Sequence, residues 1–226
     1  MADTQRGRRT MAVERGDKRA QIVAAAGRLI AREGAAAATT RKIAGEAGVN
    51  LATLHFLFGN KDALLVAVLD QVTGLMIAAL PAPTRIPRGL HGALTETVAV
   101  LWALADREPW LPIVRCELLL YLQRRPGYEQ EARAEQRRYL SALAARCYGA
   151  RATTGAKIAC KTLAELVAST LDGLALHAAF LDSKQTRKQL RALALRAVLD
   201  LVEGDGPRRG PTDGDSATKH KEQRRG

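Results

Sequence analysis

Aromatic residues are scarce in this chain of 226 residues, at 4% of the composition, and no segment alternates apolar with polar residues as half-exposed β-strands do. Leu and Ala dominate instead, and both are good helix formers. Nothing in the sequence indicates a parallel sheet. The composition therefore predicts an all-α fold, and the length suffices for one large or two modest domains with a sizeable core.

Cysteines are few and form no recognisable pair. Cys116, Cys147 and Cys160 are an odd number without a CxxC motif, and each lies in an apolar helical pattern. This favours buried free thiols in a reducing compartment. No basic segment precedes a short apolar one as in a signal peptide, and no uninterrupted apolar run approaches the roughly 20 residues that span a bilayer. We therefore expect a cytoplasmic protein without a membrane partner.

Motifs of enzyme active sites are missing as well. The four serines lie in no GxSxG context, no HExxH or paired Cys and His spacing indicates a metal, and no Gly-rich phosphate loop follows a strand. Glu165 and Asp172 share one helix face, but carboxylates on a helix surface are usually solvated. We predict no catalytic residues, no metal and no cofactor, and a helical enzyme is the less favoured alternative.

The sequence is rich in positive charge. Its formal net charge is +12 and its pI is about 10.2, which favours a polyanionic partner such as DNA. The excess is spread along the chain, because eleven Lys and Arg face six Asp and Glu over residues 1–62, and nine face five over residues 107–151. Charge alone therefore does not distinguish a sequence-specific regulator from a general DNA-coating protein.

Helical periodicity and helix breakers divide the chain into about nine helices. Both ends, residues 1–16 and 204–226, are predicted to be disordered; their basic residues could touch the DNA backbone, although solvated tails are the simpler interpretation. The proline-rich PAPTRIP separates an N-terminal domain, residues 17–72, from a C-terminal domain, residues 73–203. The expected helices cover residues 17–33, two short segments between 39 and 59, 60–80, 88–105, 109–124, 127–149, 154–182 and 184–203.

Two short helices meet at a glycine in the segment that begins at Thr39, TTRKIAGEAGVNLATLHFLFGNK. Thr39 or Thr40 can cap the first helix, Gly48 can end it in a left-handed conformation, and Asn50 can cap the second. Leu54 then points into the core, which leaves the opposite face of its helix exposed. Helices this short need other packing, so the segment is a helix-turn-helix that enters a DNA major groove or a buried helical hairpin.

Together with the following DALL, this segment resembles the DNA-binding domain of the TetR family of bacterial transcriptional regulators. The matching features are the paired Thr, Ile-Ala before Ala-Gly-Val, Thr-Leu four residues on, Phe58, and Asn-Lys-Asp-x-Leu-Leu. The resemblance covers about residues 17–72 and extends more weakly to the whole chain through the helix count. It implies an N-terminal three-helix helix-turn-helix domain, followed by a helical domain that binds a small molecule and forms a homodimer.

The resemblance also implies which residues meet double-stranded DNA: the start of the second helix, the first turn of the recognition helix, and a backbone contact at the fourth helix. The chain departs from the family pattern at His55, where Tyr is common, and at Leu57, where His is common. His55 can still donate a hydrogen bond to phosphate, but Leu57 cannot. Each residue alone could instead be merely solvated. The predicted DNA-binding residues are Thr40, Arg41, Asn50, Leu51, Ala52, Thr53, His55 and Lys61.

The resemblance places a ligand pocket and a dimer interface in the C-terminal helices. The candidate pocket residues, each of which could equally be packed core, are Trp102, Trp110, Cys116, Leu119, His177 and Phe180. Two apolar stripes on the last two helices could complete the monomer core or form half of a four-helix dimer interface. Their residues are Leu163, Leu166, Val167, Thr170, Leu171 and Leu174 on the first helix, and Leu190, Leu193, Ala194, Val198 and Leu201 on the second.

These features predict a transcriptional regulator, most simply a repressor, that binds a palindromic operator as a homodimer and responds to a small-molecule effector. A ligand in the C-terminal pocket would favour a dimer whose recognition helices are wrongly spaced for DNA. The resemblance leaves an activator open.

Overall fold

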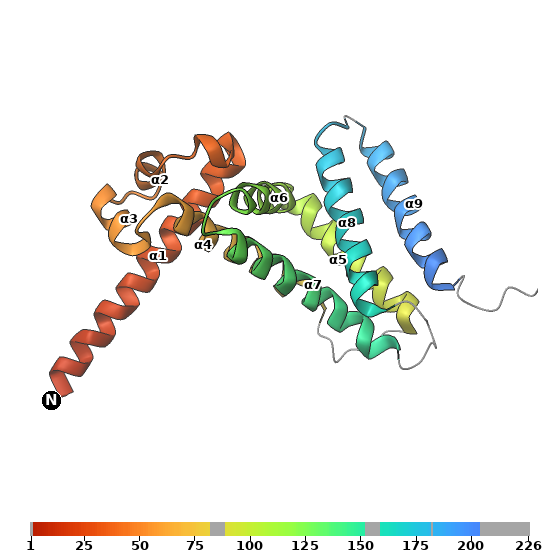
Figure 1. Cartoon of the computed structure of the whole chain (residues 1–226), viewed down its shortest axis with the longest axis horizontal. Helices are drawn as coiled ribbons and strands as arrows, with labels where there is room; N and C mark the ends of the chain where they lie inside the picture. Colours follow the sequence, from red (N-terminus) through yellow and green to blue (C-terminus); the bar gives the residue numbers. More distant parts are fainter. Residues whose placement is uncertain (1, 82–88, 152–158, 182, 204–226) are drawn as a thin grey trace, which may run out of the picture.

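The computed structural model describes residues 2–81, 89–151, 159–181 and 183–203, and over these ranges it consists of nine helices without a strand (Figure 1). The predicted all-α fold is confirmed. The helices are α1 (Ala2–Ala37), α2 (Thr40–Glu46), α3 (Leu51–Phe58), α4 (Lys61–Ala79), α5 (Gly89–Arg107), α6 (Trp110–Gln123), α7 (Glu129–Arg151), α8 (Cys160–Ala178) and α9 (Lys184–Glu203).

The start of α1 corrects the sequence prediction. Residues 1–16 were expected to form a disordered arm, but the helix already begins at Ala2, and its first turns project from the body of the protein (Figure 1). Adding residues to a helix that packing has already nucleated costs little, so a polar segment can extend it without apolar periodicity. The expected end of this helix is found at Gly34, whose φ of 82° interrupts the helical conformation. The predicted disordered tail, residues 204–226, lies outside the described residues.

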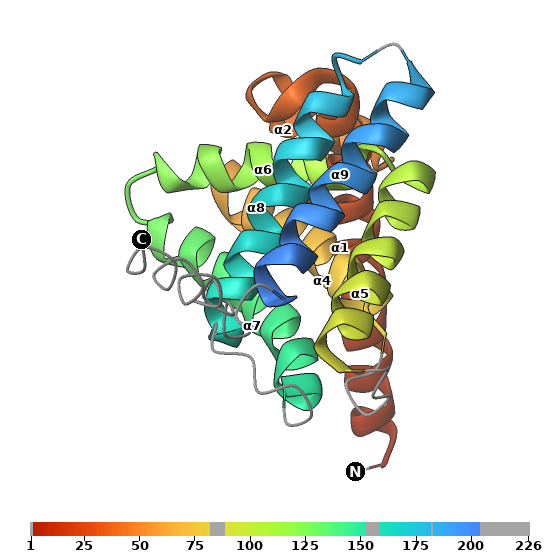
Figure 2. The same cartoon turned by 90° about the vertical axis from the view of Figure 1, so that its right-hand side faces the viewer.

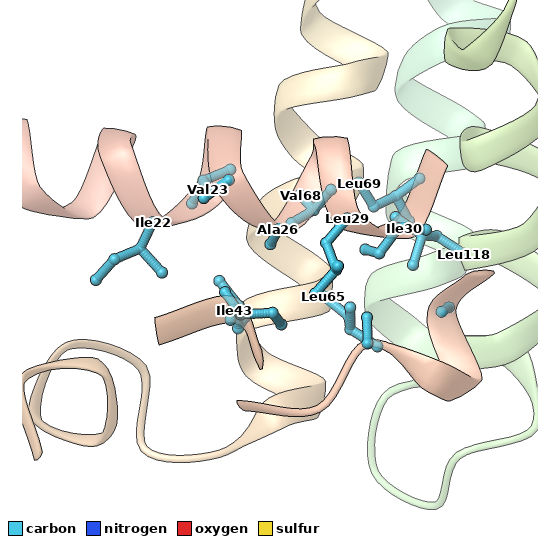
Figure 3. Packing of buried hydrophobic residues seen from close by; sticks show 14 of the residues in the cluster. Ile22, Val23, Ala26, Leu29, Ile30, Ile43, Leu65, Val68, Leu69 and Leu118 are labelled. Carbon is cyan, nitrogen blue, oxygen red and sulfur yellow. The ribbon is translucent and has the colours of Figure 1, made fainter. Parts of the chain in front are cut away.

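A first hydrophobic cluster joins α1–α4 to α6. In Figure 3, Leu29 and Ile30 of α1 lie beside Leu65 and Leu69 of α4 and Leu118 of α6, and all five side chains are buried. Sequence analysis assigned α6 to the C-terminal domain because it follows the proline-rich segment. Its apolar face nevertheless completes the core of the N-terminal domain, so the break in the chain does not coincide with a break in packing.

A second cluster forms between α5, α7, α8 and α9. Met76, near the end of α4, also belongs to this cluster, so α4 connects the two cores. Figure 1 shows α8 and α9 side by side at the end of the molecule opposite α2 and α3, and Figure 2 shows them as the foremost helices when that end faces the viewer. One face of this helix pair is therefore not covered by the rest of the described chain.

Helix α4 is the single described helix that is long and apolar enough to cross a membrane by length and composition, with a mean hydropathy of 1.7 over its best window. Sequence analysis expected no such stretch, because polar residues interrupt the apolar run. Leu64, Leu65, Val68 and Leu69 are each fully buried against neighbouring helices. This packing explains the apolar composition of α4 as that of a core helix.

Candidate DNA-binding surface and ligand cavity

The turn between α2 and α3 has the local geometry predicted for it. Thr39 Oγ1 accepts a hydrogen bond from the N–H of Lys42 at 3.3 Å, and Asn50 Oδ1 accepts one from the N–H of Thr53 at 2.6 Å. Each cap satisfies a backbone donor that the first turn of a helix leaves free. Gly48, between the helices, has a φ of 64°, a conformation that costs glycine little. The two helices are therefore joined by a locally specified turn.

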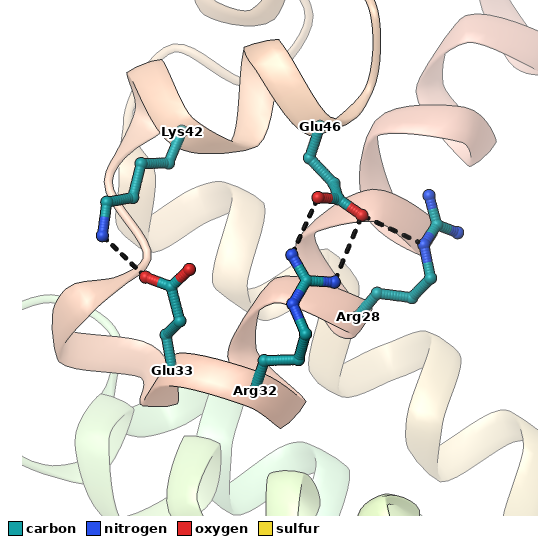
Figure 4. A network of polar contacts seen from close by, with 5 residues as sticks. All are labelled: Arg28, Arg32, Glu33, Lys42 and Glu46. Atoms are coloured by element: carbon teal, nitrogen blue, oxygen red, sulfur yellow. Dashed lines mark hydrogen bonds and ion pairs between the residues drawn. The ribbon is translucent and has the colours of Figure 1, made fainter.

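Ion pairs fix α2 to the end of α1 (Figure 4). Glu46 lies 2.8 Å from Arg32 Nη2 and 3.4 Å from Arg28 Nε, while Lys42 Nζ lies 2.6 Å from Glu33. The hydrogen bond from Arg32 lowers the pKa of Glu46. Exposed pairs of this kind contribute little singly, but five side chains from two helices together restrict the orientation of α2. The charge of Lys42 is thereby paired with Glu33.

Helix α3 is held from the side opposite its exposed face. Leu54 is fully buried, and Arg19 of α1 donates to the carbonyl of Leu57 at 3.0 Å while its guanidinium lies 4.3 Å from the ring centre of Phe58. Leu57 is half-buried and packs against the first cluster. The apolar side chain at position 57 therefore contributes to the packing of α3.

The exposed face of α3 contains Ala52, His55 and Phe56, with Thr53 half-buried at its margin. Leu51, also predicted to face DNA, is half-buried and packs against the first cluster. His55 Nδ1 lies 3.1 Å from the carbonyl of Gly59. If Nδ1 donates this hydrogen bond, Nε2 of the neutral ring can only accept, so the side chain can donate to phosphate only as an imidazolium.

Phe56 is a surface residue that the sequence reasoning missed. Its side chain is 72% exposed in the middle of α3, and the guanidinium of Arg15 lies 5.0 Å from its ring centre. The sequence did contain a signal, because Leu54 and Phe58 are four residues apart and define the buried side of the helix. A residue halfway between them must point away from the core.

The two basic residues predicted to meet DNA have different environments. Arg41, on α2, is exposed and has no hydrogen bond or ion pair with any part of the chain that the structure describes. Lys61 Nζ instead donates to the carbonyls of Ala35 and Ala36 at 2.7 and 3.2 Å, and burial lowers its pKa. Lys61 thus holds the last turn of α1 against α4. Thr40 is half-buried beside Arg41 at the start of α2.

A partly open cavity lies between helices α4 to α9, and its empty space, including the part open to solvent, is about 420 Å³. Of the six residues predicted to line a pocket, Trp102 is the one that does so. The lining is mostly apolar and contains two charged residues, Asp172 and Arg191. The complete lining is Met76, Leu101, Trp102, Leu104, Ala105, Pro112, Tyr139, Leu171, Asp172, Leu174, Ala175 and Arg191.

The other five predicted pocket residues lie elsewhere. Trp110 and Leu119 pack against the first cluster, and Trp110 Nε1 donates to Glu108 at 2.7 Å. Cys116 is half-buried but is not part of the cavity lining, whereas His177 is exposed and Phe180 is 83% exposed. These five residues do not line this cavity, because α6 and α8 have apolar residues on more than one face and periodicity alone does not indicate which face borders a cavity.

The polar wall of the cavity is formed by a buried ion pair. Arg115, fully buried on α6, donates to Asp172 of α8 at 3.1 Å and hydrogen-bonds Gln136 of α7, and its guanidinium lies 4.1 Å from the ring centre of Tyr139. Burial raises the pKa of Asp172, and the charge of Arg115 opposes this rise. The sequence-based interpretation of Asp172 as a solvated carboxylate was therefore wrong.

The residues of the two apolar stripes predicted for a dimer interface fall into three groups by exposure. Leu163, Val167, Leu171 and Val198 are buried in the second cluster, so these four complete the core of a single chain. The exposed members are Leu193, at 64%, and Leu201, at 52%. The remaining five, Leu166, Thr170, Leu174, Leu190 and Ala194, are half-buried.

Exposed apolar side chains also occur at the end of α8 and just beyond it. Leu176 is 43% exposed and Phe180, just beyond the end of α8, is 83% exposed. We call Leu176, Phe180, Leu193 and Leu201 the outer apolar face. Exposed apolar side chains on a helix pair with one uncovered face suit an interaction site.

A capped helix-turn-helix with an exposed second helix, joined to a helical domain with a cavity, defines a DNA-binding transcriptional regulator. Residues 22–68 match the family model described as bacterial regulatory proteins, tetR family. This match identifies residues 22–68 as a DNA-binding domain of the TetR type.

Comparisons with individual proteins agree with this family. The chain is 25% identical over 186 residues to the nicotine-responsive transcriptional repressor HdnoR of Paenarthrobacter nicotinovorans. The aligned region covers 82% of this chain and 96% of HdnoR. A transcriptional regulator from Rhodococcus sp. Rha1 has a similar fold, with a TM-score of 0.67, 20% identity, and coverage of 82% of this chain and 96% of the other. The regulator FadR from Bacillus subtilis, solved in complex with stearoyl-CoA, has a TM-score of 0.66 and 21% identity. The superposition covers 81% of this chain and 97% of the FadR chain.

Proposed function

We propose that this regulator is a repressor that binds a palindromic operator as a homodimer in the bacterial cytoplasm and leaves it when a small molecule occupies the cavity beside Asp172. The observation that carries the proposal is the position of α6, which packs in the core of the DNA-binding domain and also borders the cavity. The curated relative is named as a repressor that responds to nicotine, which supports the same mode of action here.

The proposed DNA contact involves the exposed face of α3 together with Arg41 of α2. Ala52 and Phe56 offer apolar contacts for thymine methyl groups, and Arg41 can reach a phosphate or a guanine edge. Asn50 acts indirectly, because its cap fixes the first turn of α3. Lys61 stabilises the end of α1, and a phosphate contact by its remaining N–H is a secondary expectation.

A dimer is proposed because one recognition helix of eight residues reads too few base pairs to specify a site. Helices α8 and α9, which carry the outer apolar face, lie at the end of the molecule opposite the helix-turn-helix (Figure 1). Two copies joined there through α8 and α9 would form a four-helix interface. The recognition helices would then have to lie roughly 34 Å apart, one turn of DNA, or further for more widely separated half-sites.

The proposed coupling passes through α6. Pro112 borders the cavity and Arg115 pairs with Asp172 on one side of this helix, while Glu117 Oε1 accepts a hydrogen bond from the N–H of Ala35 at 2.6 Å on the other. Ala35 follows Gly34, the point at which α1 departs from helical geometry. A ligand that shifts α6 would therefore move the end of α1 and the helix-turn-helix attached to it.

A further contact couples the beginning of α4 to the segment between α6 and α7. Tyr128 Oη and the side-chain amide of Asn60 lie within 3.0 Å of each other. Asn60 also caps α4, so the orientation of this helix depends on a residue that follows α6. Two independent contacts thus transmit a shift of α6 to the DNA-binding domain.

Selection of bound sequences from a pool of random DNA duplexes tests the proposal. The expected result is a palindromic consensus whose preference over random duplexes persists as salt is raised. Equal affinity for all duplexes would support the alternative, a general DNA-coating protein, and would overturn the regulator mechanism proposed here.

Arg41→Ala and Lys42→Ala provide a matched pair for the selected site. Both remove one positive charge from neighbouring positions of α2, but Lys42 is engaged by Glu33. We expect Arg41→Ala to weaken specific binding by about 1–3 kcal/mol and Lys42→Ala to weaken it less. Fluorescence anisotropy measures both, and equal losses would mean that charge, not contact, explains the effect of Arg41.

A further inference from the structure

The charges that border the cavity are already paired. Asp172 accepts from Arg115 Nη1 at 3.1 Å, and Arg191 Nη1 donates to Asp106 at 2.8 Å. Asp172 and Arg191 are the two charged residues among those that line the cavity. A charged ligand would therefore lose its hydration without meeting an uncompensated opposite charge, which makes its burial costly.

The two aromatic rings that line the cavity each already interact with an arginine side chain. The guanidinium of Arg115 lies 4.1 Å from the ring centre of Tyr139, and that of Arg191 lies 5.7 Å from the ring centre of Trp102. A ligand cation is attracted by the electron-rich face of an aromatic ring, but here each ring already interacts with a cation that would repel another. Although the cavity contains two aromatic residues and a carboxylate, it is therefore poorly suited to a protonated amine.

Two polar atoms of the lining residues have no hydrogen-bond partner among the described residues. These are Trp102 Nε1 and Tyr139 Oη, and neither atom is exposed to solvent. The indole N–H can only donate, and the phenol O–H can donate or accept. Because a buried donor without a partner costs free energy, both atoms favour a ligand that brings an acceptor.

We propose that the effector is an uncharged, largely apolar molecule with an acceptor oxygen, such as a ketone or ether, that receives hydrogen bonds from Trp102 and Tyr139. This inference rests on the proposed function, because it names the chemical class of the ligand to which the regulator responds. Leu101, Leu104 and Leu174 are among the side chains that surround the apolar remainder of the molecule.

Four naphthalene probes that share a ring system separate the alternatives. 2-Acetylnaphthalene is neutral with an acceptor oxygen, 2-ethylnaphthalene has nearly the same shape without it, 1-(2-naphthyl)ethylammonium is a cation, and 2-naphthoate is an anion. Titration calorimetry on the full-length protein is expected to give at least about tenfold tighter binding for the ketone than for the other three probes. Tighter binding of either charged probe, or no ketone binding up to its solubility limit, would overturn the proposed class.

Substitutions test whether the two unpartnered atoms bind the ketone. Tyr139→Phe and Trp102→Phe each remove one donor and retain an aromatic ring, so each should weaken ketone binding about five- to tenfold and leave binding of 2-ethylnaphthalene unchanged. Equal losses for both probes would indicate altered packing and would count against the hydrogen bonds. Arg191→Gln, which frees one face of Trp102 and leaves Asp106 unpaired, should improve binding of the ammonium probe.

DNA release is measured separately, so the two proposals can fail independently. A ketone that binds and lowers affinity for the selected operator supports both. A ketone that binds without changing DNA affinity supports the ligand class and counts against the ligand-responsive mechanism. An ammonium probe that binds and releases DNA supports that mechanism and overturns the ligand class.

Discussion

The double substitution Leu193→Glu with Leu201→Glu is expected to separate the proposed dimer into monomers. These side chains are 64% and 52% exposed, so more than half of each is available for burial by a second copy. Full burial of a leucine contributes about 1.5–3 kcal/mol, so each remaining half contributes roughly 1–2 kcal/mol. Two residues on two chains then give roughly 4–8 kcal/mol, before the cost of burying a carboxylate is added.

A loss of this size corresponds to a dissociation constant at least about 10³-fold higher. Light scattering at micromolar concentration would then report a monomer, and fluorescence anisotropy would report the loss of specific DNA binding. The helix-turn-helix itself should stay folded, because both leucines lie on α9, far from α2 and α3 (Figure 1). The circular dichroism spectrum is therefore expected to remain helical.

A matched control is available on other helices. Leu75 of α4 and Leu120 of α6 are 46% and 60% exposed, so Leu75→Glu with Leu120→Glu makes the same chemical change at similar exposure away from α8 and α9. This variant should remain dimeric. The reasoning is refuted if the α9 variant stays a dimer with wild-type DNA affinity, or if both double variants dissociate equally.

Three further outcomes follow from other contacts. Phe56→Ala should weaken binding to the selected operator several-fold without lowering the melting temperature, because this ring is 72% exposed; unchanged anisotropy would remove Phe56 from the DNA-binding surface. Glu117→Leu removes a charge-assisted hydrogen bond to Ala35 and should lower the free energy of unfolding in urea by about 1–3 kcal/mol, whereas Glu117→Gln, which keeps an acceptor, should lower it less; equal stability of all three proteins would contradict this. Burial raises the pKa of Cys116 to about 11 and that of Cys147 to about 12, so at pH 8 both thiols should react slowly with iodoacetamide in the native protein and rapidly in urea, as followed by mass spectrometry; equal rates would show that they are accessible.

The helix-turn-helix could be predicted because its determinants are local. The Asn50 cap, the glycine conformation at Gly48 and the inward position of Leu54 each depend on residues within one or two helical turns. Such features are determined by the sequence of a short segment and can be predicted from it. The same locality explains why the position of Phe56 could have been derived from Leu54 and Phe58.

The cavity and the apolar stripes could not be predicted, because they depend on which helices meet. Leu171 and Leu176 lie on the same helix with similar apolar neighbours, yet the first is 8% exposed in the core and the second is 43% exposed on the outer apolar face. Periodicity gives the faces of a helix without naming the partner of each face. Lys61 was similarly ambiguous, since its contact is with carbonyls 25 and 26 residues earlier in the chain.

The arrangement of α6 argues that the two parts of this regulator act together through packing. Leu118 is fully buried in the first cluster, while Arg115, three residues earlier, is fully buried in the pair with Asp172 at the cavity wall. A displacement of α6 would disturb both contacts, because close-packed side chains and a buried ion pair tolerate little change in distance. A ligand that alters the cavity wall must therefore either move α6 with the end of α1 or lose packing in one of the two cores. We propose that the first alternative costs less, because it keeps both cores packed, and that it would move the helix-turn-helix.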